Sequence, residues 1–254
     1  MQLTVLGVGS SAGTPAIGCG CATCTSADPR NQRTRCSSMI TLEDGQVILM
    51  DTTPDLRQQA LREHMRRVDA VLYTHTHADH LHGIDDLRAF CQINRRQIPL
   101  YSYPEAITHI QEKFGYTLRE PSSYWDLPVL AAHVVEAPFE VCGVQVTPIP
   151  VMHGRIRIYA YRIGNLVYMT DVSAIPEASF ALLQGVEVLL IDCLRDTPHP
   201  THVNVEQSLA LIAQMGARRN ILIHMTHELE YHALTARLPA NVEVGYDGLQ
   251  VTLV

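Results

Sequence analysis

Five short apolar segments of this chain end in a residue that can bind a metal ion. The segments VILMD, VLYTH, VYMTD, VLLID and ILIH end at Asp51, His75, Asp171, Asp192 and His224. Apolar, β-branched runs of this length predict buried strands. Ionisable groups at the ends of neighbouring strands meet along one edge of a sheet, where α/β folds tend to place their sites. We therefore expect an α/β protein with a polar site at a sheet edge.

Apolar runs alternate with amphipathic stretches along the whole chain, and no linker or change in composition marks a domain boundary. We expect one domain over residues 1–254, with two mixed sheets flanked by helices. The expected strands are 2–8, 38–42, 46–50, 70–74, 98–101, 143–150, 157–163, 166–170, 187–191, 219–223 and 249–253. The expected helices are 55–67, 84–95, 104–114, 176–184 and 205–216, the last starting near Asn204 or Thr201.

Composition and charge limit the classes of partner. Apolar residues make up 46% of the chain and charged residues 18%, which predicts a fully folded protein. A net charge of −7 argues against binding along nucleic-acid phosphates. Basic residues cluster at 30–35 and at Arg155 and Arg157, where a solvated surface is the simplest interpretation. No apolar run is long enough for a membrane span and the N-terminus lacks a basic secretion signal, so we expect a cytoplasmic protein without membrane contact.

The densest group of metal-binding side chains is the run HTHADH at residues 75–80. Imidazole and carboxylate groups are ligands of divalent ions such as zinc and manganese. His75 and His77 are two residues apart, so in an extended segment they point the same way and can hold one ion. Asp79 and His80 follow as the chain turns and can reach a second ion. The run therefore predicts a metal-dependent hydrolase with two ions.

The HTHADH run resembles the signature of the metallo-β-lactamase superfamily, whose fold is an αββα sandwich with its metal site at the sheet edges. The resemblance spans residues 3–254. It implies further ligands in the segments VMHG, YMTD and LIHMTH, namely His153, Asp171 as a bridge, and His224. One ion would be held by His75, His77, His153 and Asp171, and the other by Asp79, His80, Asp171 and His224. Asp51 matches an aspartate that supports the ligands from outside.

Two cations this close lower the pKa of a bridging water and give a hydroxide nucleophile without a side-chain nucleophile. They also stabilise charge that develops on a phosphoryl or acyl oxygen. The expected chemistry is hydrolysis, with zinc, manganese or iron as the candidate metals.

Three of the seven cysteines, Cys19, Cys21 and Cys24, lie within six residues. An odd number of cysteines and this spacing indicate metal ligation in a reducing compartment rather than a disulfide framework. A structural zinc needs a fourth ligand, and His227, three residues after His224, is the candidate. The alternative is a group of buried free thiols. The other cysteines, at 36, 91, 142 and 193, are expected to be core thiols.

The cysteine group together with HTHADH and LIHMTH resembles the phosphoribosyl cyclic phosphodiesterase branch, known from phosphonate breakdown. That resemblance implies a small phosphate-ester substrate such as phosphoribosyl 1,2-cyclic phosphate, and a structural zinc on three cysteines and a histidine. It also implies a further histidine that contacts the substrate phosphate or protonates the leaving oxygen. His202 is the better match and His199 the alternative, while a loop histidine before the helix at 205 is the simplest interpretation. Asp79 and His202 are the expected catalytic residues.

Several other functions share this ligand set. A nuclease that trims transfer RNA 3′ ends normally needs a long basic arm, and none is visible. A relative linked to pyrroloquinoline quinone formation carries a similar cysteine group, and lactone or thioester hydrolases share the two-ion site. A metal-binding module without turnover is the alternative from outside the enzymes. Related enzymes are often dimers, so a homodimer is considered beside a monomer.

Overall fold

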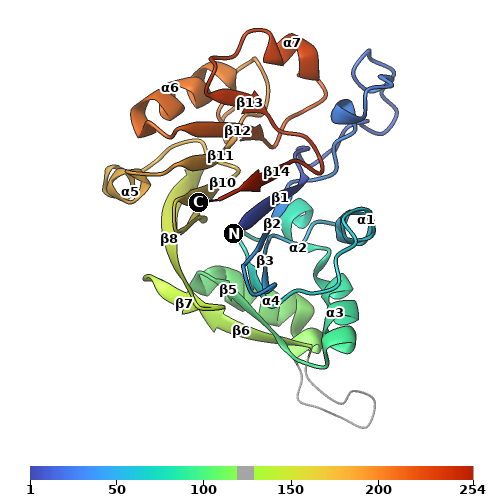
Figure 1. The fold of residues 1–254 in the computed structure, drawn as a ribbon, viewed down its shortest axis with the longest axis vertical. Helices are drawn as coiled ribbons and strands as arrows, with labels where there is room; N and C mark the ends of the chain where they lie inside the picture. Colours follow the sequence, from blue (N-terminus) through green and yellow to red (C-terminus); the bar gives the residue numbers. More distant parts are fainter. Residues whose placement is uncertain (119–128, 254) are drawn as a thin grey trace.

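The structure is a computed structural model that describes residues 1–118 and 129–253. Two seven-stranded sheets pack face to face in it, with helices outside (Figure 1). The first sheet has the strand order β14 (Gln250–Thr252), β1 (Gln2–Gly7), β2 (Ser37–Thr41), β3 (Val47–Met50), β4 (Ala70–Leu72), β5 (Ile98–Ser102) and β6 (Leu130–Val134). The second has the order β13 (Val242–Val244), β12 (Arg219–Ile223), β11 (Val188–Asp192), β10 (Leu166–Met169), β9 (Ile156–Ile163), β8 (Val144–His153) and β7 (Phe139–Val141).

The helices divide between the two sheets. The first sheet is accompanied by α1 (Leu56–Arg62), α2 (Ala78–Leu81), α3 (Leu87–Asn94) and α4 (Pro104–Phe114). The second is accompanied by α5 (Glu177–Phe180), α6 (Val205–Met215) and α7 (Tyr231–Thr235). This arrangement confirms the expected αββα sandwich.

Alternation along the strands explains why both faces of the first sheet are covered. In β3, Ile48 and Met50 belong to the large apolar core that includes the second sheet, while Leu49 belongs to a smaller core with Leu56 of α1 and Leu87 of α3. Because successive side chains of a strand point to opposite faces, one all-apolar strand packs against a sheet on one side and helices on the other. The site residues must therefore emerge at the strand ends.

The predicted elements are mostly confirmed, with local corrections. The predicted helix 55–67 ends early, because His64 has a left-handed backbone with φ of 52°. The predicted helix 84–95 begins as a 3₁₀ turn and becomes α-helical only at Leu87. The predicted helix 176–184 is likewise split into α5 and a 3₁₀ turn. The last predicted helix is capped by Asn204, whose side chain accepts a hydrogen bond from the Gln207 backbone N–H, and not by Thr201.

Five short elements were not predicted, namely β6, β7, β13, α2 and α7. The three strands have only three to five residues, and β6 and β7 are partly exposed, so none has the long apolar run of the inner strands. Within the part of the chain that the structure describes, no helix has the length and apolar character needed to cross a bilayer.

Candidate metal centre

The ends of three strands carry acidic or imidazole side chains on strained backbone. Asp51, Asp171 and His224 follow β3, β10 and β12 with φ values of 60°, 54° and 58°. A left-handed backbone costs of order 1–3 kcal/mol in a residue other than glycine and concentrates at functional sites. Each of these three residues is nearly or fully buried. The fold therefore keeps strained, polar residues in one place, as expected for a site.

The first predicted ligand group is brought together around one oxygen of Asp171. His75, His77, His153 and Asp171 offer ligand atoms that all lie within 4.8 Å of one another. The Oδ2 atom of Asp171 lies 3.8 Å from His75 Nε2 and 3.9 Å from His153 Nε2. His75 and His77 leave β4 in an extended segment, and His153 ends β8. Such a set of three imidazoles and one carboxylate matches the ligands of a zinc-type ion.

The second predicted group gathers around the other oxygen of Asp171. Asp79, His80 and His224 form a group within the same 4.8 Å limit. Asp171 Oδ1 lies 3.1 Å from His80 Nε2 and 3.4 Å from His224 Nε2. Asp79 Oδ2 lies 3.4 Å from His80 Nε2 and 3.6 Å from His224 Nε2. Asp171 thus presents one carboxylate oxygen to each group, which is the geometry a bridging ligand needs.

The second ring nitrogen of several histidines is held by a hydrogen bond. His80 Nδ1 donates to Asp51 Oδ2 at 2.8 Å, and His153 Nδ1 donates to the carbonyl oxygen of Thr201 at 2.8 Å. A held Nδ1–H fixes the tautomer and leaves the Nε2 lone pair facing the site. Asp51 thus holds the ring of His80 from outside the ligand group, in line with the predicted supporting role.

Several histidine ring nitrogens of the site are buried without a hydrogen-bond partner, and this indicates whether metal ions fit there. Within the described residues, Nε2 of His75, His80 and His224 is buried without a hydrogen-bond partner. Burial by itself lowers the pKa of His80, but the carboxylates of Asp171 and Asp51 outweigh it and hold that pKa well above its usual range. Buried ring nitrogens without a protein partner, beside carboxylates that attract positive charge, are what a bound cation would satisfy. The residues present therefore fit two divalent ions.

Asp192 was noted as a strand end but not predicted to be a site residue. Its Oδ2 accepts a hydrogen bond from His202 Nδ1 at 2.8 Å, and its Oδ1 lies 3.6 Å from His224 Nδ1. Asp192 is fully buried at the end of β11. It therefore contacts one predicted ligand and one predicted catalytic histidine. The signal was its place at the end of an apolar strand, shared with the ligands.

His202 lies inside the site, whereas His199 lies beside it. The Nε2 atom of His202 is 3.9 Å from Asp171 Oδ2, and its ring stacks on that of His224 at 4.9 Å. Asp171, His202 and His224 also form a group within 4.8 Å. The His199 ring is 5.2 Å from that of His202, and its Nδ1 accepts a hydrogen bond from the Thr201 backbone N–H. The geometry favours His202 of the two.

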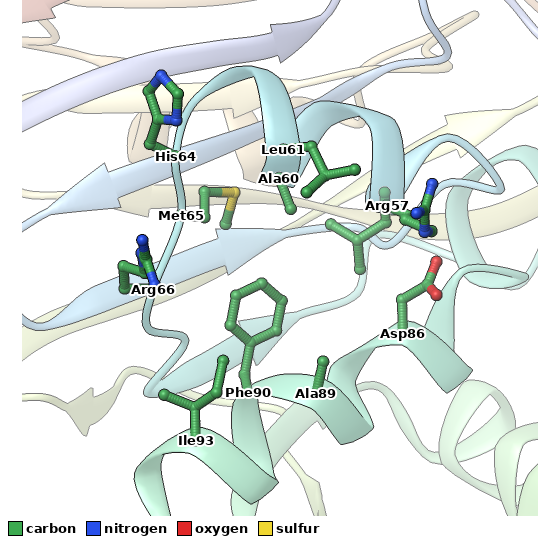
Figure 2. Close-up of a pocket in the computed structure, with 11 residues that line it drawn as sticks. Arg57, Ala60, Leu61, His64, Met65, Arg66, Asp86, Ala89, Phe90 and Ile93 are labelled. Carbon is green, nitrogen blue, oxygen red and sulfur yellow. The ribbon is translucent and has the colours of Figure 1, made fainter.

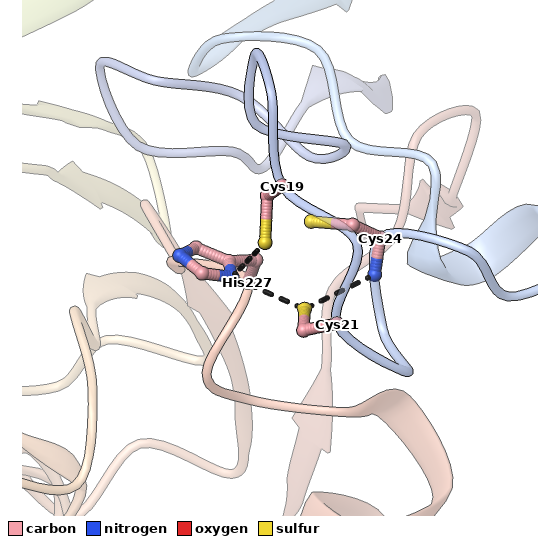
Figure 3. A group of neighbouring side chains, drawn as sticks. All are labelled: Cys19, Cys21, Cys24 and His227. Atoms are coloured by element: carbon pink, nitrogen blue, oxygen red, sulfur yellow. Dashed lines mark hydrogen bonds between the residues drawn. The ribbon is translucent and has the colours of Figure 1, made fainter.

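The three clustered cysteines and His227 lie together, as Figure 3 shows. His227 Nδ1 lies 3.5 Å from Cys19 Sγ and 3.3 Å from Cys21 Sγ. The Cys24 thiol accepts a hydrogen bond from the Ala16 backbone N–H at 3.3 Å. The hydrogen bonds from His227 and from the Cys24 backbone lower the pKa of Cys21 to about 6. Three sulfurs and one imidazole nitrogen within 4.8 Å fit a tetrahedral zinc.

The basic cluster at 30–35 is not simply a solvated surface, and that prediction was wrong for Arg33. Arg33 is 2% exposed and donates to the carbonyl oxygens of Thr226 and Leu229. These carbonyls flank His227 in the chain. Arg33 therefore fastens the segment that carries His227 to the segment that follows the cysteines.

A separate cavity of about 470 Å³ lies between α1 and α3 (Figure 2). Its walls are largely apolar, with Leu61, Phe90 and Ile93 among them, and none of the predicted metal ligands lines it. Leu61 and Ile93 are 60% and 59% exposed. This cavity is therefore distinct from the candidate metal centre.

Comparison with known proteins places the chain in a family. A model described as the beta-lactamase superfamily domain matches residues 46–225. A crystal structure described as a new diphosphatase from the PhnP family superposes with a TM-score of 0.92 and 38% identity, over 100% of this chain and 98% of that one. Zn²⁺-bound PqqB from Methylobacterium extorquens superposes with a TM-score of 0.80 at 20% identity, over 100% of both chains, which shows a shared fold alone.

A curated relative is a protein named octanoyltransferase from Porphyromonas gingivalis. It is 37% identical over 257 residues, which cover 100% of this chain and 52% of that protein. The chain thus spans about half the length of this relative. Because the name describes a protein that extends well beyond the match, octanoyl transfer is not carried over to this chain.

Proposed function

Since the chain belongs to the beta-lactamase superfamily of metal-dependent hydrolases, we propose that it is a dinuclear phosphodiesterase that opens a small cyclic phosphate ester. Phosphoribosyl 1,2-cyclic phosphate is the proposed substrate. The main support for this proposal is one buried carboxylate, that of Asp171, whose two oxygens face two different ligand groups. Asp171 turns Oδ2 toward His75 and His153, and Oδ1 toward His80 and His224.

The proposed ligands of one ion are His75, His77, His153 and Asp171, and those of the other are Asp79, His80, Asp171 and His224. Zinc, manganese or iron suit this set. When bound, the ions supply a hydroxide nucleophile near neutral pH and neutralise charge on the phosphoryl oxygens. The side chains around them orient the ligands and exclude bulk water, because most of the groups are nearly or fully buried.

His202 and Asp192 are proposed to serve the leaving oxygen. Asp192 holds His202 Nδ1–H, so His202 Nε2 points toward Asp171 and the centre of the site. Burial, with His224 nearby, lowers the pKa of His202 to about 4, so the resting ring is neutral. An incoming phosphate anion favours the protonated ring, which can then give its Nε2 proton to the departing alkoxide. A ring-opening alkoxide leaves poorly without such a proton.

The cysteine group is proposed to hold a structural zinc. Its ligands are Cys19, Cys21, Cys24 and His227. His227 lies three residues after His224, so an ion held there stabilises the same segment that brings His224 to the site. This ion would serve folding rather than turnover, since all four positions are taken by side chains.

A diphosphate is the second candidate substrate. The structure at 38% identity and TM-score 0.92 is described as a diphosphatase. Water attacks a doubly esterified or bridged phosphorus in both reactions, and the two differ in the group that leaves. The phosphate monoester that leaves when a diphosphate is cleaved needs less protonation than a sugar alkoxide. Dependence on His202 therefore distinguishes the two candidates.

A substrate panel tests the proposal. Metal-loaded protein is incubated with phosphoribosyl 1,2-cyclic phosphate, a 2′,3′-cyclic nucleotide, UDP-glucose and a transfer RNA precursor, and products are followed by phosphorus NMR or gel. We expect ring opening of the phosphoribosyl substrate to have the highest kcat/KM, and Asp79→Ala and His153→Ala to abolish it. Processing of transfer RNA alone would support the nuclease alternative. No turnover with zinc, manganese or nickel would support a metal-binding module.

A further inference from the structure

A polar cavity of about 430 Å³ is lined by residues that neighbour His77 and His153 in the chain, among them Thr76 and Arg155. Thr76, which lies between two proposed ligands, forms one wall. The turn between β8 and β9 forms another, through Arg155, Ile156 and Arg157. This turn follows His153 directly, and the rings of His77 and His153 are 5.0 Å apart. The cavity and the metal centre therefore share two segments of backbone.

The remaining wall is the start of α4, which offers unpaired donors. The 11-residue helix has Tyr103 as its N-cap residue, with no side-chain hydrogen bond to cap it. Tyr103 is 6% exposed and lines the cavity, and its hydroxyl has no hydrogen-bond partner among residues 1–118 and 129–253. Burial raises the pKa of Tyr103 to about 12, so the hydroxyl stays protonated and can donate. A hydroxyl donor without a protein partner and an uncapped helix start both favour an anion.

The charged side chains of the cavity have a positive excess. Two arginines, Arg155 and Arg157, share the lining with one carboxylate, that of Glu105. Arg157 Nη2 lies 4.0 Å from Glu105 Oε1, so these two charges offset one another. Arg155 is exposed and has no carboxylate partner within the described part of the chain. The local excess contrasts with the chain's net charge of −7.

We propose that this cavity binds a second phosphate group of the substrate, with Arg155 as the main positive contact and the Tyr103 hydroxyl as a neutral donor. The inference rests on the proposed function, because it places the reacting phosphate at the metal centre next door. Arg157 and the start of α4 contribute to the same anion site. In the proposed substrate this second group is the 5-phosphate of the ribose.

Arg155 and Arg157 are specificity-determining residues in this proposal, not catalytic ones. A guanidinium forms paired hydrogen bonds with a phosphate, which are stronger than those between neutral groups. Loss of one such contact weakens binding on the order of 10- to 100-fold. A substrate that lacks the second phosphate cannot lose this contact. The ratio of kcat/KM for the two substrates therefore reports on the cavity.

The first test is equilibrium binding of ribose 5-phosphate to the metal-loaded full chain, measured by calorimetry. Ribose serves as the ligand without phosphate. The variants are Arg155→Met, Arg155→Lys and Arg157→Met. Arg218→Met is the matched control, because Arg218 is also exposed and lies 4.0 Å from a carboxylate, that of Glu187, but does not line the cavity. We expect Arg155→Met to raise the Kd for ribose 5-phosphate about tenfold or more, and Arg155→Lys to raise it less.

The second test compares phosphoribosyl 1,2-cyclic phosphate with the same compound after removal of its 5-phosphate. Arg155→Met is expected to lower the ratio of kcat/KM for the two compounds about tenfold or more, mainly through KM. Equal losses on both compounds, or ribose 5-phosphate binding as tight as in the control, would overturn the proposal. If neither compound is hydrolysed, the proposed function fails, and the binding test still decides whether the cavity holds phosphate.

Discussion

Asp51→Asn is a substitution that changes one buried carboxylate oxygen into an amide nitrogen. Asp51 Oδ1 accepts from the Thr74 backbone N–H at 2.8 Å. Its Oδ2 accepts from the Thr74 hydroxyl at 2.8 Å and from His80 Nδ1 at 2.8 Å. In the variant, the amide oxygen keeps the backbone N–H, and the amide NH₂ then faces His80. Two donors cannot share that contact, so His80 must move its proton to Nε2.

The substitution lowers metal affinity as well as the stability of the fold. A proton on His80 Nε2 removes the lone pair that faces Asp171 and Asp79. Loss of such a supporting contact costs about 10- to 100-fold in metal affinity. The lost charge-assisted hydrogen bond costs about 1.5–3 kcal/mol of stability. Only one of the two ion positions should weaken, because His80 belongs to only one group.

Competition titration against a chelating indicator measures both metal affinities, and urea unfolding measures stability. Asp69→Asn is the matched control: Asp69 is 1% exposed and accepts from the Val47 backbone N–H and from Arg67, away from the site. We expect both variants to lose stability, and only Asp51→Asn to lose affinity for one ion. Two ions bound as tightly in Asp51→Asn as in the unaltered protein would refute the tautomer argument.

Three further predictions follow from single contacts. Cys21→Ser should lower Tm by about 5–10 °C, measured by calorimetry, and remove about one zinc per chain, measured by metal analysis. An unchanged zinc content would contradict a zinc site at Cys19, Cys21 and Cys24. His202→Ala should lower kcat on the cyclic phosphate about 10²- to 10⁴-fold. It should lower kcat on bis-p-nitrophenyl phosphate much less, because the p-nitrophenolate leaving group needs no proton. Equal losses on both substrates would argue against His202 as a general acid. Arg33→Met should cost about 2–4 kcal/mol in urea unfolding because buried carbonyls lose their donor, and a loss under about 0.5 kcal/mol would show that water replaces it.

The sequence predicted the parts of the site that depend on local order. The ligands in the HTHADH run lie within six consecutive residues. A strand followed by a short helix is therefore enough to bring them close together. The strand ends at Asp51, Asp171 and His224 could be predicted because inner strands are continuous apolar runs. The family resemblance, and not the segments themselves, indicated which strand ends come together. No single segment determines the order of the strands in a sheet.

Long-range contacts could not be predicted from the residues alone. Arg33 resembles its solvated neighbours in the sequence, and its acceptors at Thr226 and Leu229 lie about 190 residues away. The pairing of Asp192 with His202 depends on a loop that returns to the strand end before α6. The short strands β6 and β7 were not predicted, because half-exposed strands of three to five residues have little apolar pattern.

Titration of metal-depleted protein with Mn²⁺, while ring opening of phosphoribosyl 1,2-cyclic phosphate is followed by phosphorus NMR, tests the central claim most directly. The structural zinc is retained by using a mild chelator, and its content is checked separately. The account predicts that the rate rises to a plateau at two Mn²⁺ per chain, and that Asp79→Ala stays inactive at any Mn²⁺ concentration. Full turnover without added metal, or full activity in Asp79→Ala, would contradict it.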